Sequence, residues 1–598
     1  MVASARMVAS ARFPRAIAVA IAAAAAGVMV WRMRHGVDFS DEAFYAALPL
    51  RFALGDRPFI DELNLTQTAG LLIYPFVKVY TAIVGSAAGL ILFLRILQLA
   101  FFGCVGWSAY ALARMRLSQA TSLVVGVSCL CVIPYGLPGL SYNTLTMGLF
   151  AFGLFVAARG LLGLLLPPPS DSPAAAPGLR ARFVAFVRSP LVLAGFAHGA
   201  ASFAYPTMAL GAAATTLAVA ILAKGERARA VLRYVGGGFA FGLIVAPSLL
   251  RAGASRLREV VVYTGGEQSS TGLGDRLHTV GASFLTFHPQ LPLAGLVLAV
   301  AILLARRWPM PAALALPFAP LLALGSVMDA PVLASIAYVA CFAVLAPLFC
   351  LGIRDTKVAR VLLIGIAMPA FVAGVATAWS SSNAAKAAGI GLYPAAILGG
   401  LALAVFVDEA KPSFRWPFLR AAMDLSPVVL VGTLLGFVLA REAYYRDQNR
   451  SELTALVTEG PYAGIYTAPA KKRDLERITA EIHARIHGER ALFFYDFPAG
   501  YLIAYRRPLV TSPWTFIMPS RIEPDARFFR ERARGGELVM RDDSRWGSPN
   551  PQPAPETLPD GAALSTTPLD LAVSERCDLV AKGPGYSMYV VRPEGIAP

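Results

Sequence analysis

Long apolar runs alternate with short charged loops along the first 440 residues of the chain. Each run has about 16 to 25 residues, the length that an α-helix needs to cross the hydrocarbon core of a bilayer. Because lipid offers no partners for backbone polar groups, this pattern predicts an all-α polytopic membrane helix bundle. The predicted spans, about thirteen in number, are 16–31, 88–112, 118–137, 143–164, 190–206, 208–223, 231–250, 291–305, 309–327, 331–351, 360–379, 389–407 and 424–440.

The short loops carry clusters of Lys and Arg, which the positive-inside rule places in the cytoplasm. Examples are Arg114 with Arg116 and the segment 224–230. With these loops inside, the N-terminus is cytoplasmic and the chain after the last span is extracytoplasmic. The apolar segment 70–85 then lies as a helix at the outer interface, within a first external loop of residues 32–87.

The composition is that of a helical membrane protein, and it also bears on which partners the protein can bind. The chain has 598 residues, 56% of them hydrophobic, a mean hydropathy of +0.59 and a formal net charge of +16. Since the basic residues sit in short loops between apolar runs, the charge reflects membrane orientation, and nucleic acid is excluded as a partner. The Ala- and Arg-rich composition suggests the inner membrane of a bacterium.

The sequence changes character after the last span, which divides the chain into a membrane domain, 1–440, and a second domain, 441–598. The second domain holds no spanning run. Residues 474–489 have the spacing of an amphipathic helix, while "ALFFYD" at 491–496 and "DLVAKG" at 578–583 have the composition of strands. We therefore expect a small extracytoplasmic α/β domain.

The first external loop concentrates acid in an otherwise apolar chain. It holds six carboxylates, which are Asp38, Asp41, Glu42, Asp56, Asp61 and Glu62. A helix is predicted from about residue 41, with Ser40 as its cap, Asp41 and Glu42 in its first turn and Gly55 at its end. Acids in a first turn suit the helix dipole and need do nothing else. The alternative is that the pair supplies a general base or a metal ligand at the membrane surface.

This stretch resembles a known family. An acidic pair "DE" soon after the first span, followed by "RFALGDRPF" and a helix that leads into the second span, is similar to the GT-C class of membrane glycosyltransferases, and most to the branch of protein O-mannosyltransferases and the lipid A aminoarabinose transferase. The resemblance implies a sugar donor on polyprenyl phosphate and an inverting reaction. It also implies that Asp41, with Glu42 beside it, is catalytic, either as a base that activates the acceptor hydroxyl or, as in the oligosaccharyltransferases, as a metal ligand.

The sequence departs from the family pattern at two places, which affect the expected metal dependence and the binding of the donor phosphate. Gln67 and Thr68 stand where the aminoarabinose transferase type has Lys-Pro, and Tyr142 and Asn143 stand where several relatives have an acid. We therefore expect a metal-independent reaction without a cofactor, and we take Gln67, Tyr142 and Asn143 as substrate-binding candidates. For the last two, an ordinary helix start is the simpler interpretation.

Four arginines are further substrate-binding candidates. Arg95 lies inside the second predicted span, where an unpaired charge is costly and therefore suggests a functional cavity. Arg256, Arg258 and Arg276 lie in an external loop, against the positive-inside bias, and suit the phosphate of a lipid-linked donor. Binding of lipid headgroups without catalysis is the alternative for these three.

The sequence thus predicts an integral membrane glycosyltransferase that uses a polyprenyl-phosphate sugar. Its acceptor would be a glycan, lipid or protein outside the cytoplasm, and membrane lipid would surround it. A transporter or flippase of lipid-linked glycan is the alternative from another class; internal repeats and ionisable residues at the membrane midplane would favour it. A polymerase or ligase of glycan chains is a third possibility.

Overall fold

The computed structural model describes most of the chain. The described residues are 2–133, 136–165, 188–265, 334–381, 383, 385–410, 447–495, 497–515, 519–543 and 567–593, with scattered positions between 275 and 300. The predicted spans 309–327 and 424–440, and most of 291–305, lie outside them, as does Arg276. The number of thirteen spans therefore stays a prediction.

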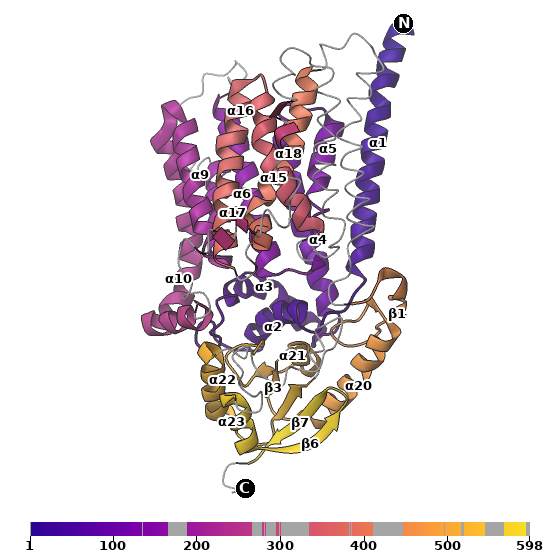
Figure 1. Cartoon of the computed structure of the whole chain (residues 1–598), viewed down its shortest axis with the longest axis vertical. Helices are drawn as coiled ribbons and strands as arrows, with labels where there is room; N and C mark the ends of the chain where they lie inside the picture. The colour runs from indigo at the N-terminus through magenta and orange to yellow at the C-terminus, as the bar shows by residue number, and fades with distance from the viewer. Residues whose placement is uncertain are drawn as a thin grey trace.

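A bundle of roughly parallel helices forms the larger part of the molecule (Figure 1). Its helices are α1 (Val2–Met33), α4 (Leu90–Ala113), α5 (Gln119–Ser128), α6 (Tyr142–Leu165), α8 (Pro190–Ala204), α9 (Met208–Leu222), α10 (Arg227–Gly265), α15 (Ala334–Gly352), α16 (Thr356–Leu362), α17 (Met368–Trp379) and α18 (Ala385–Ala410). Among the described residues, seven helical segments are long and apolar enough to cross a membrane. The predicted helical membrane protein is confirmed at this level.

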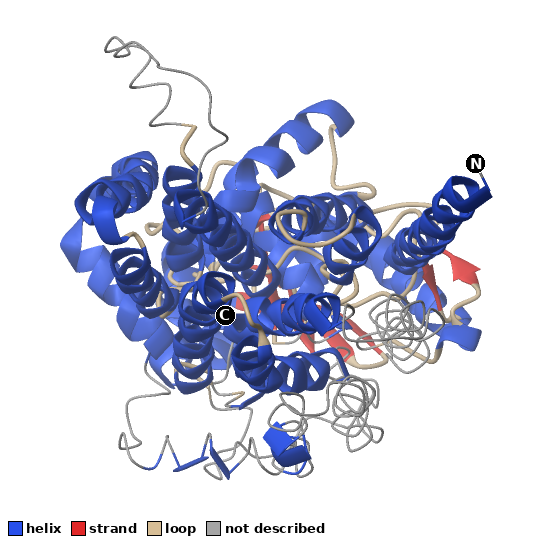
Figure 2. Ribbon diagram, turned by 90° about the horizontal axis from the view of Figure 1, so that it is seen from above, coloured by secondary structure: helices blue, strands red, loops and turns tan. Residues whose placement is uncertain are grey.

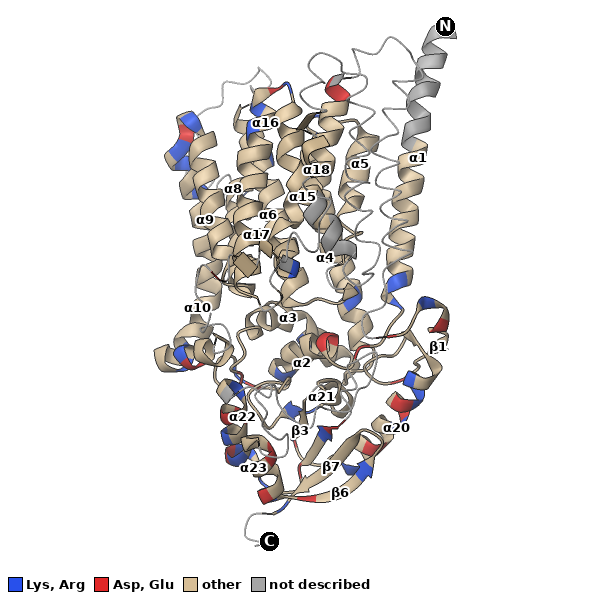
Figure 3. Cartoon of the chain, in the orientation of Figure 1, with Lys and Arg blue, Asp and Glu red and all other residues tan. Residues whose placement is uncertain are grey.

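Small residues let the helices approach closely. An added Cβ at Gly195 of α8 would lie 1.8 Å from the carbonyl oxygen of Tyr234 in α10. One at Gly237 of α10 would lie 2.0 Å from the carbonyl oxygen of Val192. Backbone contact of this kind replaces the hydrophobic effect as a packing force in lipid. Charged residues gather at the two ends of the bundle and beyond them, as Figure 3 shows, in agreement with the apolar runs of the sequence.

Two helices of the first loop lie at one end of the bundle. They are α2 (Asp41–Ala53) and α3 (Gln67–Val84), and they pack against each other. Figure 1 places both between the bundle and the C-terminal segments. The helix α10 reaches the same end, where Gly253 with φ 73° breaks its helical path.

The C-terminal segments form a mixed sheet with helices. The strand order is β4-β3-β5-β7-β6, with β3 parallel to β4 and β5, and β7 antiparallel to β5 and β6. Seen from above, the strands gather beneath the bundle (Figure 2). The elements are β1 (Ala455–Leu456), β2 (Tyr466–Thr467), α20 (Pro469–Arg485), β3 (Arg490–Phe494), α21 (Ala499–Ala504), β4 (Arg507–Pro508), α22 (Pro519–Arg532), β5 (Leu538–Asp542), α23 (Pro568–Arg576), β6 (Cys577–Gly583) and β7 (Tyr586–Val591).

Candidate functional site

The start of α2 is fixed by Asp38. One oxygen of its carboxylate accepts hydrogen bonds from the backbone N–H and the hydroxyl of Ser40, at 3.0 and 2.8 Å, and the other accepts the N–H of Glu42 at 2.7 Å. The predicted cap at Ser40 is therefore wrong: its side chain makes no capping hydrogen bond, because its hydroxyl is donated to Asp38. A carboxylate is the stronger acceptor for the N–H groups of a first turn.

Glu42 and Arg95 form a buried ion pair. Nε and Nη2 of Arg95 lie 2.7 and 2.6 Å from the two carboxylate oxygens of Glu42, the fork geometry of a bidentate contact. Arg95 is 1% exposed and Glu42 is 4% exposed. Burial raises the pKa of the Glu42 carboxyl, and the guanidinium of Arg95 opposes that shift. Both carboxylate oxygens of Glu42 are therefore bound to Arg95, next to Asp41 in the chain.

Arg95 also holds the chain that connects α1 to α2. It donates to the carbonyl oxygens of Met33, His35 and Gly36 at 2.9, 3.0 and 2.7 Å. With the two contacts to Glu42, these bonds occupy all five N–H groups of the guanidinium. We therefore assign Arg95 to positioning α2 rather than to the substrate, for which the sequence had suggested it.

A second buried arginine organises the rest of the loop. Arg51, 1% exposed, donates to Asp56 at 2.9 Å, to Glu62 at 2.5 Å and to the carbonyl oxygens of Asp61 and Thr511, both at 2.8 Å. Thr511 belongs to the C-terminal segments that form the mixed sheet and its helices, so the side chain of Arg51 joins the first loop to them. Burial raises the pKa of Glu62 to about 7, against the effect of Arg51.

The same loop makes further ion pairs with the C-terminal segments. Asp56 lies 2.7 Å from Arg490, and Asp61 lies 2.9 Å from Arg532. The guanidinium of Arg57, on the loop itself, also contacts Asp61. Together with the contacts above, these pairs show what most of the acid in the loop does: Asp38, Glu42, Asp56, Asp61 and Glu62 fix its conformation.

Asp41 lies in the first turn of α2, as the sequence predicted. It is 9% exposed and acts electrostatically on the hydroxyl of Tyr142, at the start of α6. Tyr142 in turn packs edge-on against Tyr45 of α2, with ring centroids 5.6 Å apart. Asp41 therefore lies near the start of α6, where Asn143 is buried.

A row of aromatic rings extends from this point in both directions. Tyr142 stacks on Tyr205 at 5.6 Å, and on the other side the rings of Tyr45, Phe44 and Trp514 follow one another at 5.3 and 5.4 Å. The members come from α2, α6, the segment after α8 and the C-terminal domain. Tyr142, Tyr205 and Trp514 are partly exposed, so the row presents ring faces and edges beside Asp41.

Two other substrate-binding candidates, Gln67 and Arg256, make structural contacts instead. Gln67 is buried and spans its own loop: its amide oxygen accepts the N–H of Phe59 at 2.7 Å and its nitrogen donates to the carbonyl of Glu62 at 3.0 Å. Arg256 pairs with Glu259 and lies over the ring of Phe528. We therefore assign Gln67 and Arg256 to structure.

Arg258 is the exposed member of the predicted phosphate-binding set that the structure describes. It follows the break at Gly253 of α10, at the α2 end of the bundle. Within the described ranges, no three His, Cys, Asp or Glu side chains come together as a metal site would require.

A buried acid in α22 makes stability depend on pH. Burial raises the pKa of Asp525 to about 7, and its neighbours are Thr511, whose N–H donates to it at 3.1 Å, and the hydroxyl of Tyr263 at 3.4 Å. A carboxyl with a raised pKa stabilises the fold in its protonated form, and this contribution is lost as the pH rises through the folded-state pKa. We expect the free energy of unfolding to fall by about 1 kcal/mol from this group between pH 6 and 8.

Asp525→Asn tests this effect, because an amide reproduces the protonated acid. Thermal unfolding of wild type and variant in detergent should show the variant to be the more stable at both pH values, with the larger difference at pH 8, because the carboxyl of the unfolded chain is already ionised at pH 6. Equal pH profiles for the two proteins would contradict the assignment. Glu62 remains in both proteins, but the charge of Asp525 contributes to its raised pKa, so the difference reports Asp525 together with its coupling to Glu62.

Several residues of the site carried no signal in the sequence. Arg51 is one arginine among many, and its partner Glu62 lies in the same loop without helical spacing to it. Tyr205 and Trp514 read as ordinary core aromatics, since their neighbours in the row are distant in the chain. The opposite charges of Arg51 and Asp56 within one short loop were the available clue.

No protein-family model and no curated protein matches the chain. Among solved structures, it is similar to the archaeal oligosaccharyltransferase AglB from Archaeoglobus fulgidus, solved with an inhibitory peptide and a dolichol-phosphate, at 13% identity over 97% of this chain and 75% of that chain, with a TM-score of 0.42. It is also similar to ArnT from Cupriavidus metallidurans in the apo state, at 15% identity over 96% and 97% of the two chains, with a TM-score of 0.42. These neighbours are GT-C glycosyltransferases, the class whose pattern the first external loop resembles.

Proposed function

We propose that the protein is a membrane glycosyltransferase that moves a sugar from a polyprenyl-phosphate donor to an acceptor outside the cytoplasm, with Asp41 as general base. The observation that carries the proposal is the setting of Asp41. Its helix is held by the buried groups Asp38, Arg95 and Arg51, and it faces the aromatic row at the end of the membrane bundle. Fixed geometry of this kind supplies much of an enzyme's acceleration.

The chemistry follows from that setting. Asp41 takes the proton of an acceptor hydroxyl, whose oxygen attacks the anomeric carbon of the sugar. The bond from that carbon to the phosphate oxygen breaks, and the electron pair leaves with the polyprenyl phosphate. Attack opposite to the leaving group inverts the anomeric centre. The products are the glycosylated acceptor and polyprenyl phosphate, and the proton remains on Asp41 until water removes it.

Substrate groups have candidate partners around Asp41. The partly exposed rings of Tyr142, Tyr205 and Trp514 suit stacking against a sugar. Arg258, exposed at the same end of the bundle, suits the phosphate of the leaving group. With the sugar against the aromatic rings and the phosphate at Arg258, the transfer would occur at the membrane surface, where a lipid-linked donor and a water-borne acceptor can meet.

Two buried ionisable groups of the described helices, His198 and Arg95, do not favour a transporter. His198 of α8 uses both ring nitrogens, on the hydroxyl of Tyr234 at 2.5 Å and the carbonyl oxygen of Phe150 at 3.0 Å. Arg95 is bound on every N–H group, as described above. Such groups stabilise helix packing, whereas a transport path needs ionisable groups that exchange partners.

The proposal is tested by release of polyprenyl phosphate from a panel of polyprenyl-phosphate sugars in detergent, with a broad acceptor mixture. We expect wild type to release it, and to do so equally in EDTA. Loss of release in EDTA would make Asp41 a metal ligand and overturn its role as a base. Absence of release with every donor, from a protein that unfolds cooperatively, would contradict transferase activity.

A further inference from the structure

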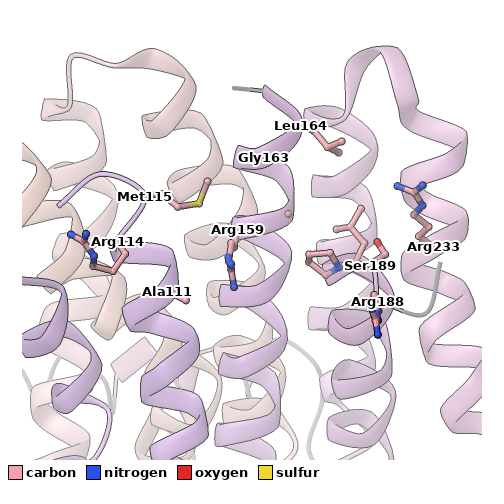
Figure 4. Close-up of a pocket in the computed structure, with 12 residues that line it drawn as sticks. Ala111, Arg114, Met115, Arg159, Gly163, Leu164, Arg188, Ser189 and Arg233 are labelled. Atoms are coloured by element: carbon pink, nitrogen blue, oxygen red, sulfur yellow. The ribbon is translucent and has the colours of Figure 1, made fainter. Parts of the chain in front are cut away.

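A pocket of about 660 Å³ opens between four helices of the bundle. It lies around the C-terminal ends of α4 and α6 and the N-terminal ends of α8 and α10. Four of its lining residues are arginines, one from each of these helix ends: Arg114, Arg159, Arg188 and Arg233. Figure 4 shows Arg114 on one flank, Arg188 and Arg233 on the other, and Arg159 between them.

The pocket is separate from the proposed active site. The helix α6 begins at Tyr142, beside Asp41, and Arg159 lies near its other end. At a rise of 1.5 Å per residue, the two positions are about 25 Å apart along the axis. The pocket therefore opens at the opposite end of the bundle, the end that the basic loops predict to be cytoplasmic.

The depth of the arginines matches the level of lipid phosphates. Arg159 precedes the end of α6 at Leu165 by six residues, and Arg233 follows the start of α10 at Arg227 by six residues. Each guanidinium is thus attached about 9 Å inside a helix end. An arginine at that depth is costly unless its charge is met by an anion or by water at the headgroup level.

Among the described residues that line the pocket, the positive charge is unbalanced. Arg114 donates one hydrogen bond, to the carbonyl oxygen of Leu117 at 2.6 Å. Among the described residues that line the pocket there is no Asp or Glu. Four guanidinium groups around one cavity repel one another, and a phosphate, which accepts paired N–H bonds from arginine, relieves that repulsion.

The remaining lining decides between a lipid and a soluble phosphate. Met115, Leu164, Pro190 and Leu191 form an apolar wall next to the arginines. A basic pocket with an apolar wall between membrane helices suits a headgroup that carries acyl chains. We propose that this pocket binds the phosphate headgroup of an anionic phospholipid of the cytoplasmic leaflet, a site distinct from the donor site.

Native mass spectrometry of the purified full chain in detergent tests the proposal, with added phosphatidylglycerol as the probe and phosphatidylcholine as the neutral comparison. The pocket variant is Arg159→Gln with Arg233→Gln. Its matched control is Arg227→Gln with Arg360→Gln, which removes two exposed arginines of the same membrane end outside the pocket. We expect the pocket variant to bind phosphatidylglycerol about thirtyfold more weakly than wild type, and the control to bind it within about twofold of wild type.

If the control variant lost as much phosphatidylglycerol binding as the pocket variant, a specific site would be overturned. Binding of phosphatidylcholine to wild type as strongly as phosphatidylglycerol would overturn it too. Displacement of the lipid by millimolar glycerol phosphate would identify a soluble phosphate as the ligand and overturn the lipid occupant. If the double variant does not fold, Arg188→Gln replaces it, because Arg188 precedes α8 and is exposed. Unchanged lipid binding by a folded Arg188→Gln would count against the pocket.

Discussion

Asp41→Asn is expected to lower kcat by about 10²–10⁴-fold, the usual contribution of a general base. The amide has nearly the shape of the carboxylate but cannot take the proton of the acceptor hydroxyl. Because the neighbours of Asp41 are held by Asp38 and Arg95, the donor site should keep its form. We therefore expect the KM for the donor to change little, measured by release of polyprenyl phosphate at several donor concentrations.

The controls for this prediction separate chemistry from folding. Asp41→Glu keeps a base at a shifted position and should recover part of the rate. Glu459→Gln removes an exposed carboxylate from the C-terminal domain and should leave the rate unchanged. If Asp41→Asn retained kcat within about threefold of wild type, well below the usual contribution of a base, Asp41 would not be the base.

Arg95→Met is expected to lower the free energy of unfolding by about 3–5 kcal/mol, the cost of leaving a buried charge unpaired. The variant leaves the Glu42 carboxylate without its bidentate partner and frees the carbonyl oxygens of Met33, His35 and Gly36. Since these groups fix the approach to α2, the position of Asp41 is lost as well. Thermal and denaturant unfolding in detergent measure the first effect, and polyprenyl-phosphate release measures the second.

A double variant tests whether the ion pair is the cause. Arg95→Met combined with Glu42→Gln removes both charges, so it should regain part of the stability that the single variant loses. Arg57→Met is the matched control, because Arg57 is an arginine of the same loop whose side chain is 68% exposed. It should cost less than about 1 kcal/mol. An equally small cost for Arg95→Met would contradict the role assigned to it.

The elements of the fold were largely predictable from local pattern. Within the described residues the apolar runs identified most of the long helices, but the predicted span 118–137 is helical only over Gln119–Ser128 of α5. The predicted strands at 491–496 and 578–583 appear as β3 and β6. The predicted helix at 474–489 appears as α20, which begins earlier, at Pro469, and ends at Arg485, where Ile486 is extended and Gly488 has a positive φ. Periodicity is local information, and helices and strands follow from it.

The site was only partly predictable, because its contacts join distant parts of the chain. Asp41 in a first helical turn is a local feature, and the sequence located it. Arg95, the partner of Glu42, is 53 residues away in the chain. Because the sequence does not show this pairing, an arginine inside a predicted span suggested a substrate-binding site, whereas in the structure it completes a buried ion pair. Thr511, which accepts from Arg51, is 460 residues away. Without the tertiary fold, a structural arginine and a substrate-binding arginine have the same sequence signal.

The most direct test of the account follows a labelled polyprenyl-phosphate sugar in sealed vesicles that contain the purified full chain and an enclosed acceptor. The account predicts that wild type cleaves the donor, with the label appearing on the acceptor and polyprenyl phosphate accumulating in equal amount. Vesicles with Asp41→Asn should keep the donor intact. Movement of uncleaved donor to the other leaflet by both proteins would contradict the account and establish a flippase instead.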